Sequence, residues 1–262
     1  MSKIEVLAVT MNAENFDLVN KMQITSNAII ANQARKNEYA VYSQNKNIKM
    51  VTTTTRGVGA NRNLCLLYAS GDICVLADDD MIFDKNYEQT VYRAFTEIPE
   101  ADILIFNLDT IGEITRNRRN NTKITKVNRF NVMNYGAARV AFKLNSIRKA
   151  NLFFSVLFGG GCPYSSGEDT LFLYTALKKG LKIYTYPKRI ATVTQTTSSW
   201  FEGYTDKYFR DKGALYYALT SNKITYNLLC VQDAIRHQKL YKRKVLDILH
   251  LMIEGMNTYK NH

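Results

Sequence analysis

Short apolar runs and helix-like segments alternate through the first part of the chain, and this alternation most constrains the fold. Runs of strand length cover residues 4–10, 27–31, 48–53, 73–77 and 102–108. Segments with apolar residues at three- and four-residue spacing, or bounded by Gly and Pro, cover residues 15–24, 60–70 and 86–97. Strands that alternate with helices in this way predict a layered α/β domain.

The second part of the chain changes character. Residues 112–135 are polar and basic and predict an excursion, after which a helix over 168–179 and a strand over 182–186 resume the alternation. From about residue 205 the pattern is mostly helical. We therefore predict an α/β domain over residues 1–200 and a helical C-terminal extension over 201–262 that packs on it.

The charge of the chain is strongly positive. Thirty-five Lys and Arg stand against 23 Asp and Glu, a formal net charge of +12. Such a surface attracts nucleic acid, anionic lipid or phosphorylated small molecules, although a generally basic soluble protein explains it equally well. The four cysteines have no CxxC or metal-ligand spacing, and no apolar stretch approaches the length of a membrane span. A cytoplasmic protein is expected.

Three consecutive aspartates follow the apolar run over residues 73–77. If that run is a parallel strand, Asp78, Asp79 and Asp80 lie at the carboxyl edge of the sheet, where open α/β sheets bind ligands. Adjacent carboxylates repel one another, and a divalent cation such as Mg²⁺ or Mn²⁺ removes that cost. Asp78 and Asp80 could converge on one cation. The alternative is a solvated acidic loop that caps the next helix.

Two longer segments resemble a known family. Residues 57–83 read GVGANRNLCLLYASGDICVLADDDMIF, and residues 167–187 read GEDTLFLYTALKKGLKIYTYP. The first resembles the donor-binding half of family 2 glycosyltransferases, with its D-x-D signature, and the second resembles the "G-E-D" helix of that family. Residues 198–215 resemble a segment of bacterial members that build surface polysaccharides.

The resemblance implies a GT-A fold, a Rossmann-like nucleotide-diphospho-sugar transferase domain. It also implies a nucleotide-sugar donor, with a UDP-sugar favoured, a divalent cation (Mn²⁺ or Mg²⁺), and inversion at the anomeric carbon. The acceptor it implies is a saccharide or a lipid-linked sugar in polysaccharide biosynthesis.

The same resemblance assigns roles to the acidic residues. Asp80 falls on the metal ligand of the signature, and Asp78 on the residue that contacts the donor or the water shell of the metal. Asp169 falls on the catalytic base. We also expect Asp79 and Glu168 to belong to the donor-binding residues. An inverting transfer needs one such base to take the proton of the acceptor hydroxyl. The alternative for Glu168 and Asp169 is that they only complement the dipole at a helix start.

Basic and polar residues complete the predicted donor site. Arg62, beside a glycine turn, suits a pyrophosphate, although an exposed helix arginine would look the same. Thr10 closes the first strand and could contact the base or ribose. Asn32 stands where the family often carries an aspartate that hydrogen-bonds to uracil. This chain has no acidic residue there, although an amide can still hydrogen-bond to a nucleobase. Gln195 stands where many relatives supply a metal-binding histidine.

An acceptor platform and a membrane contact are also predicted. Trp200, the only tryptophan, could stack on a sugar ring, or could serve as a packing anchor. Residues 227–256 have apolar positions at helical spacing and a basic cluster, which is typical of a helix that lies on an anionic membrane. The alternative is a core helix with a solvated basic face. If the helix lies on the membrane, the protein is expected to be peripheral at the inner face of the cell membrane.

Two other functions explain part of the sequence. A nucleotidyltransferase also places aspartates after a strand, but it would show a Gly-rich basic loop after the first strand, where this chain reads MNAENFD. A non-catalytic polyanion-binding protein explains the net charge, but not the acidic residues at strand and helix ends. Nucleic acid is therefore not expected as a partner.

Overall fold

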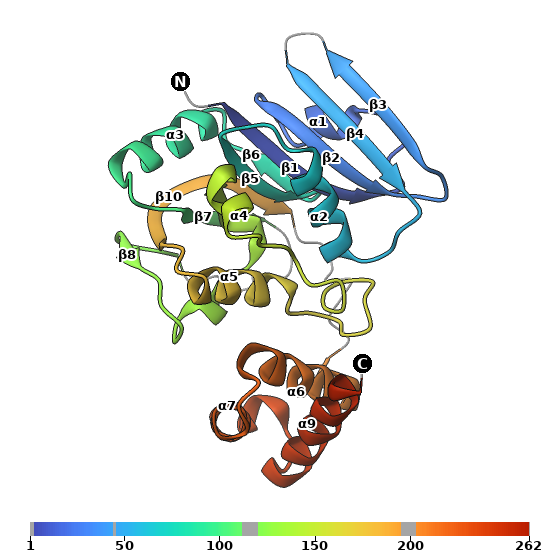
Figure 1. The fold of residues 1–262 in the computed structure, drawn as a ribbon, viewed down its shortest axis with the longest axis vertical. Coiled ribbons are helices and arrows are strands. Elements are labelled where there is room, and N and C mark those ends of the chain that lie inside the picture. The colour runs from blue at the N-terminus through green and yellow to red at the C-terminus, as the bar shows by residue number, and fades with distance from the viewer. Residues whose placement is uncertain (1–2, 44–45, 112–119, 195–202, 262) are drawn as a thin grey trace.

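The computed structural model describes residues 3–43, 46–111, 120–194 and 203–261. These residues form a mixed sheet with helices on both faces and a group of C-terminal helices below it (Figure 1). The strands are β1 (Ile4–Met11), β2 (Asn27–Gln33), β3 (Glu38–Ser43), β4 (Asn47–Thr53), β5 (Ile73–Asp78), β6 (Met81–Phe83), β7 (Ile103–Ile111), β8 (Thr125–Lys126), β9 (Val140–Lys143) and β10 (Ile183–Thr194). The helices are α1 (Asp17–Lys21), α2 (Val58–Tyr68), α3 (Tyr87–Glu97), α4 (Leu144–Lys149), α5 (Glu168–Lys178), α6 (Asp206–Thr220), α7 (Lys223–Arg236), α8 (Gln238–Tyr241) and α9 (Val245–Lys260), with two short 3₁₀ turns at Val132–Asn134 and Ala137–Arg139.

The sheet has the order β3-β4-β2-β1-β5-β9-β7-β10-β6, and β8 pairs with β10. Strands β4, β2, β1 and β5 are parallel neighbours. The short β9 lies antiparallel between β5 and β7, and β7 runs parallel to β10. The carboxyl ends of β4, β2, β1 and β5 therefore meet at one edge, where the polar residues of the sequence analysis lie.

Side chains alternate between two apolar layers along the central strands. Val6 and Ala8 of β1 join a cluster with α1 and α3, whereas Leu7 and Val9 join a cluster with α2, α4 and α5. Because both faces are covered, these strands are apolar throughout, which is why their runs are continuous rather than alternating.

The predicted strands and helices are confirmed, with changes at their ends. Helix α1 is shorter than the predicted 15–24, and β10 does not stop before Pro187 but continues to Thr194. The register of β10 against β7 shifts between Thr185 and Arg189. Pro187 lies within this interruption, where a strand tolerates a residue without a backbone N–H. The predicted domain boundary falls at residues 195–202, outside the described residues.

The C-terminal helices pack closely through two glycines. A methyl group added at Gly213 of α6 would lie 2.0 Å from the carbonyl oxygen of Met252, and one added at Gly255 of α9 would lie 1.9 Å from that of Arg210. The two helix backbones therefore touch. In the part of the chain that the structure describes, no helix combines the length and apolarity needed to cross a membrane.

Gly255→Ala should lower the free energy of unfolding of the helical extension by about 2 kcal/mol or more, because the backbones of α6 and α9 must separate. Urea unfolding followed by circular dichroism measures this. Asn257→Ala, an exposed change on the same helix, should have little effect. If Gly255→Ala were instead more stable, as the higher helix propensity of Ala alone predicts, the close contact would be wrong.

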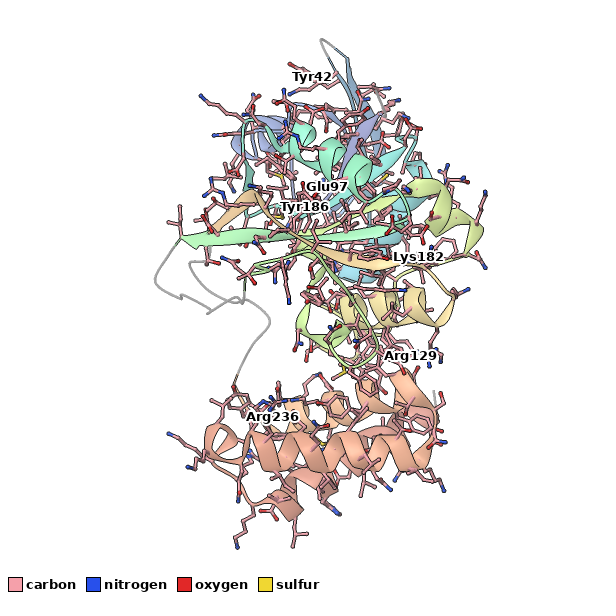
Figure 2. All side chains as sticks on the ribbon, turned by 90° about the vertical axis from the view of Figure 1, so that its left-hand side faces the viewer. Tyr42, Glu97, Arg129, Lys182, Tyr186 and Arg236 are labelled. Atoms are coloured by element: carbon pink, nitrogen blue, oxygen red, sulfur yellow. The ribbon has the colours of Figure 1, made fainter. Side chains whose placement is uncertain are left out.

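The helical extension contacts the start of α5. The Asp211 carboxylate of α6 accepts hydrogen bonds from the backbone N–H and the hydroxyl of Ser165, at 2.9 and 2.7 Å. Leu215 of α6 lies against Gly167, where an added methyl group would come within 2.6 Å of it. Seen from the side, the extension forms its own layer beyond α5 (Figure 2). Helix α5, which begins with Glu168 and Asp169, therefore packs against the sheet on one side and contacts the helical extension on the other.

Candidate functional site

The carboxyl edge of the parallel strands gathers the predicted donor-site residues. Thr10 of β1 lies opposite Asn32 of β2, and Val9 lies opposite Asp78 of β5. The first turn of α2 and the start of α5 face the same edge. The predicted acidic and basic residues, far apart in the sequence, therefore meet at the end of the sheet.

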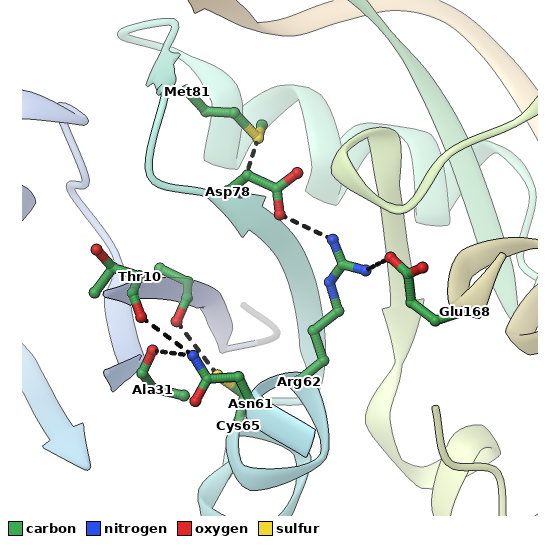
Figure 3. A network of polar contacts seen from close by, with 9 residues as sticks. Thr10, Ala31, Asn61, Arg62, Cys65, Asp78, Met81 and Glu168 are labelled. Atoms are coloured by element: carbon green, nitrogen blue, oxygen red, sulfur yellow. Dashed lines mark hydrogen bonds and ion pairs between the residues drawn. The ribbon is translucent and has the colours of Figure 1, made fainter. Parts of the chain in front are cut away.

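Arg62 lies between two carboxylates at the centre of this edge. Its Nη1 donates to Oε1 of Glu168 at 2.7 Å, and its Nη2 donates to Oδ1 of Asp78 at 2.9 Å (Figure 3). The Arg62 side chain is only 6% exposed, against 12% for Glu168 and 38% for Asp78. Burial opposes its charge, but Asp78, Glu168 and Asp169 together raise its pKa above the usual value. The predicted contact of Arg62 with a pyrophosphate stays a prediction.

Two asparagines flank Arg62 and tie α2 to the rest of the site. The Asn61 amide donates to the carbonyl oxygens of Ala31, at 2.8 Å, and Thr10, at 3.3 Å (Figure 3). Asn63 exchanges two hydrogen bonds with the backbone of Phe154. The sequence analysis gave neither asparagine a role. The signal that could have indicated them was the presence of two amide side chains, Asn61 and Asn63, in the first turns of a largely apolar helix.

Glycines allow the helix starts to approach. Gly57 has a φ of 109°, and its carbonyl accepts a hydrogen bond from the Gln33 amide at 2.8 Å. A methyl group at Gly59 would lie 2.0 Å from the carbonyl oxygen of Ser155. One at Gly159 would lie 2.7 Å from Oε2 of Glu168. The glycine-rich turns at 57–59 and 159–161 thus bring α2 and the start of α5 together.

Asp169 differs from the other carboxylates of the site. Its Oδ1 accepts the backbone N–H of Thr170 at 2.7 Å. Burial and the neighbouring charge of Glu168 raise its pKa to about 6, against an opposing effect of Arg62. A carboxyl group tuned in this way is ionised at neutral pH yet basic enough to accept a proton in a reaction. These are the properties that a general base needs, and the assignment of that role to Asp169 stays a prediction.

The aspartate cluster occupies the end of β5 and the turn to β6. The backbone N–H of Asp78 donates to Sδ of Met81 at 3.4 Å (Figure 3). The Thr10 hydroxyl donates to Oδ2 of Asp79 at 2.7 Å, and the carbonyl of Asp80 accepts the N–H of Thr194 at 3.0 Å. The turn is therefore fixed to β1 and β10. The Thr10–Asp79 bond gives Asp79 a structural function that the sequence did not suggest.

The remaining predicted residues are placed as follows. Asn32 is fully buried, and its amide bonds to the backbone of Ala13 and to the Thr52 hydroxyl. A contact with a nucleobase would require it to leave these bonds, so that role stays a prediction. Trp200 and Gln195 lie outside the described residues.

No group of three His, Cys, Asp or Glu side chains is arranged to hold a metal ion within the described residues. The candidate donors are the carboxylates of the β5–β6 turn, which are the oxygen ligands that Mg²⁺ and Mn²⁺ prefer. Mg²⁺ is commonly held by only one or two carboxylates together with substrate phosphates. The donor set therefore fits a cation that a diphosphate helps to bind.

The family model described as glycosyl transferase family 2 matches residues 29–161, half of the chain. The matched region contains Asn32, Arg62 and the aspartate cluster. The chain belongs to glycosyl transferase family 2. Its fold is therefore GT-A with a helical C-terminal extension, and the protein is a glycosyltransferase.

Solved structures show the same fold. Staphylococcus aureus TarS 1–349 in complex with UDP-GlcNAc is 14% identical and has a TM-score of 0.59, with 90% of this chain and 72% of that chain covered. TarS 1–349 in complex with UDP is 16% identical, with a TM-score of 0.56 and coverages of 90% and 71%. A longer TarS structure is 15% identical and has a TM-score of 0.59, with 90% of this chain and 43% of that chain covered. No curated protein sequence matches the chain significantly.

Proposed function

We propose that this family 2 glycosyltransferase transfers a sugar from a nucleoside diphosphate, with UDP favoured, to a saccharide or lipid-linked acceptor, with inversion. The observation that carries the proposal is the meeting of Asp169, with its raised pKa, and the Asp78–Asp80 turn at one sheet edge. The complexes of TarS with UDP-GlcNAc and UDP support a uridine donor by analogy of fold. A role in polysaccharide biosynthesis in the cytoplasm belongs to the same proposal.

A divalent cation completes the proposed donor site. Asp80, with Asp78 as a second carboxylate, would hold Mn²⁺ or Mg²⁺, which neutralises the charge that develops on the departing diphosphate. Asp78 already bonds Arg62 through Oδ1. Arg62 thereby fixes the position of Asp78 and lowers the repulsion among the carboxylates before any donor binds.

Asp169 performs the proton transfer in the proposed reaction. Its carboxylate accepts the proton of the acceptor hydroxyl as that oxygen attacks the anomeric carbon on the face opposite the diphosphate. One displacement of this kind inverts the configuration and needs no second carboxylate as nucleophile. Trp200 is proposed as the platform for the acceptor sugar.

Thermal unfolding with nucleotide-sugars tests donor binding. UDP and UDP-sugars should raise the midpoint more with Mn²⁺ than without it, because a ligand at a hundred times its Kd adds about 2.7 kcal/mol of stability. Asp80→Asn should remove the Mn²⁺-dependent part. Asp84→Asn, which alters a partly exposed aspartate that pairs with Arg189, is the matched control and should keep it. Stabilisation by ATP alone would favour a nucleotidyltransferase and contradict the proposal.

A further inference from the structure

Helix α7 carries a row of apolar side chains that face away from the protein. Ile224, Leu228, Val231 and Ile235 are 73, 65, 40 and 60% exposed. Their spacing of four, three and four residues places them on one face of the helix. The opposite face of α7 packs inward through Tyr226, Cys230 and Ala234. We call the four exposed residues the α7 stripe.

Basic side chains surround both ends of the α7 stripe. Lys223 begins the helix, Arg236 ends it, and Lys239 follows on α8 beside Leu240, which is itself 55% exposed. Lys242 and Lys244 are exposed just beyond. In the described part of the chain, none of these five cations forms an ion pair. Two of the acids in the extension pair with other cations, as Asp206–Arg243 and Asp233–Lys212.

The charge of the extension is positive as a whole. Residues 203–261 contain ten Lys and Arg against five Asp and Glu, and four of those five acids are in ion pairs with other residues of the extension. The labelled Arg236 lies on this layer (Figure 2). A second copy of the chain would bring a like-charged rim against this one, which opposes self-association through the stripe.

The sequence predicted an amphipathic surface over residues 227–256 as a unit, and the structure divides it. On α9, Ile248, Met252 and Met256 are buried against α6 and α7, whereas Leu246 and Ile253 are 78 and 45% exposed. Five of the seven exposed large apolar residues of α7, α8 and α9 lie on α7 and α8. The region available to a partner is therefore displaced towards the start of the predicted segment.

We propose that the α7 stripe and its basic rim form a docking surface for an anionic lipid bilayer. The helix, about 21 Å long, would lie in the plane of the interface with Ile224, Leu228, Val231 and Ile235 in the acyl boundary. The five cations would contact lipid phosphates, each contributing to attraction that falls with ionic strength. The surface lies outside the donor site, so the proposal stands independently of the sugar transferred.

Co-sedimentation with vesicles of phosphatidylcholine alone, or of phosphatidylcholine mixed with anionic phosphatidylglycerol, tests the proposal. The full chain should bind the anionic vesicles and lose that binding in high salt. Ile224→Ser with Leu228→Ser should lower the partition coefficient at least about tenfold, because two large apolar side chains no longer insert. Lys239→Gln with Lys242→Gln should lower it about tenfold or more.

Matched controls distinguish binding by this surface from nonspecific hydrophobic adsorption and from nonspecific attraction by positive charge. Leu67→Ser removes an apolar side chain that is 71% exposed on α2, and Lys149→Gln with Lys188→Gln removes two exposed charges elsewhere. All should bind as the unaltered chain does. Equal binding to neutral and anionic vesicles, or full binding by the Ile224/Leu228 variant, would overturn the proposal. So would a concentration-dependent dimer in sedimentation velocity that the same variant abolishes, since the stripe would then serve a second copy.

Discussion

Replacing Asp169 by Asn should lower the rate of transfer by about 10²- to 10⁴-fold and leave donor affinity almost unchanged. The loss is that of a general base, because Asn keeps the shape of the side chain and its bond to the N–H of Thr170 but cannot accept the acceptor proton. Transfer by the unaltered enzyme should rise with pH through about 6, where Asp169 ionises, and then level off. Asp109→Asn, which alters a half-exposed aspartate in an ion pair with Arg189, should keep full activity.

The same substitution should stabilise the folded protein. Because the folded state holds the pKa of Asp169 at about 6, above the usual 3.8, ionising this group costs stability as pH rises from about 4 to 6. The variant avoids this cost, so its midpoint of thermal unfolding should exceed that of the unaltered enzyme above pH 6 and match it near pH 4. Full transfer activity, or a midpoint below that of the unaltered enzyme at pH 7, would contradict the assigned role.

Arg62→Met should lower the free energy of unfolding by about 3–5 kcal/mol at pH 7. The substitution leaves the carboxylates of Asp78, Glu168 and Asp169 without their shared cation, and the Glu168 carboxylate is only 12% exposed, so the cost exceeds that of losing the pair itself. Part of the loss should disappear at acid pH, because Asp169, whose pKa is raised to about 6, is then protonated. The substitution should also raise the pKa of Asp169 further, because Arg62 opposes that rise in the unaltered enzyme. Urea unfolding at pH 7 and pH 4 measures the first effect.

Arg189 offers a matched control for Arg62. It also bridges two carboxylates, Asp84 at 2.9 Å and Asp109 at 2.5 Å, but its side chain is 48% exposed. Arg189→Met should therefore cost only about 0–1 kcal/mol, the range of exposed ion pairs. If the two variants lost equal stability, burial would not be what makes Arg62 important.

Much of the fold follows from local patterns. The strands at 4–10, 27–31 and 73–77 are continuous apolar runs because the sheet is covered on both faces, and such runs are recognisable without a partner. The Asp78–Asp80 turn was predictable for the same reason, since it directly follows a buried strand. Local sequence therefore located the metal-binding candidates at the end of the sheet.

Other elements depend on partners that no local pattern names. Among the described residues, strand β3 pairs with β4 alone, and its Tyr39 and Val41 are half exposed, so it lacks the apolar run of a buried strand. Strand β6 has three residues and is defined by its pairing with β10. These strands were absent from the prediction because their stability comes from residues far away in the sequence.

The organisation of the site was also partly hidden. The sequence placed Arg62 beside a pyrophosphate, but the bond to Glu168 joins residues 106 positions apart. Nothing at Arg62 itself indicates that partner. Likewise, Asn32 sits at the predicted strand end, yet its amide is used by Ala13 and Thr52. Strand ends predict which residues gather, whereas the contacts among them come only from the folded chain.

The configuration of the released sugar tests the central claim most directly. UDP-N-acetylglucosamine carries an α-linked sugar, and with Mn²⁺ and water as the acceptor, proton NMR can follow the first free sugar before it mutarotates. The account predicts release of UDP with the β anomer formed first, and release at least about a hundredfold slower by the Asp169→Asn variant. Initial formation of the α anomer, or equal release by the variant, would contradict inverting transfer with Asp169 as the base.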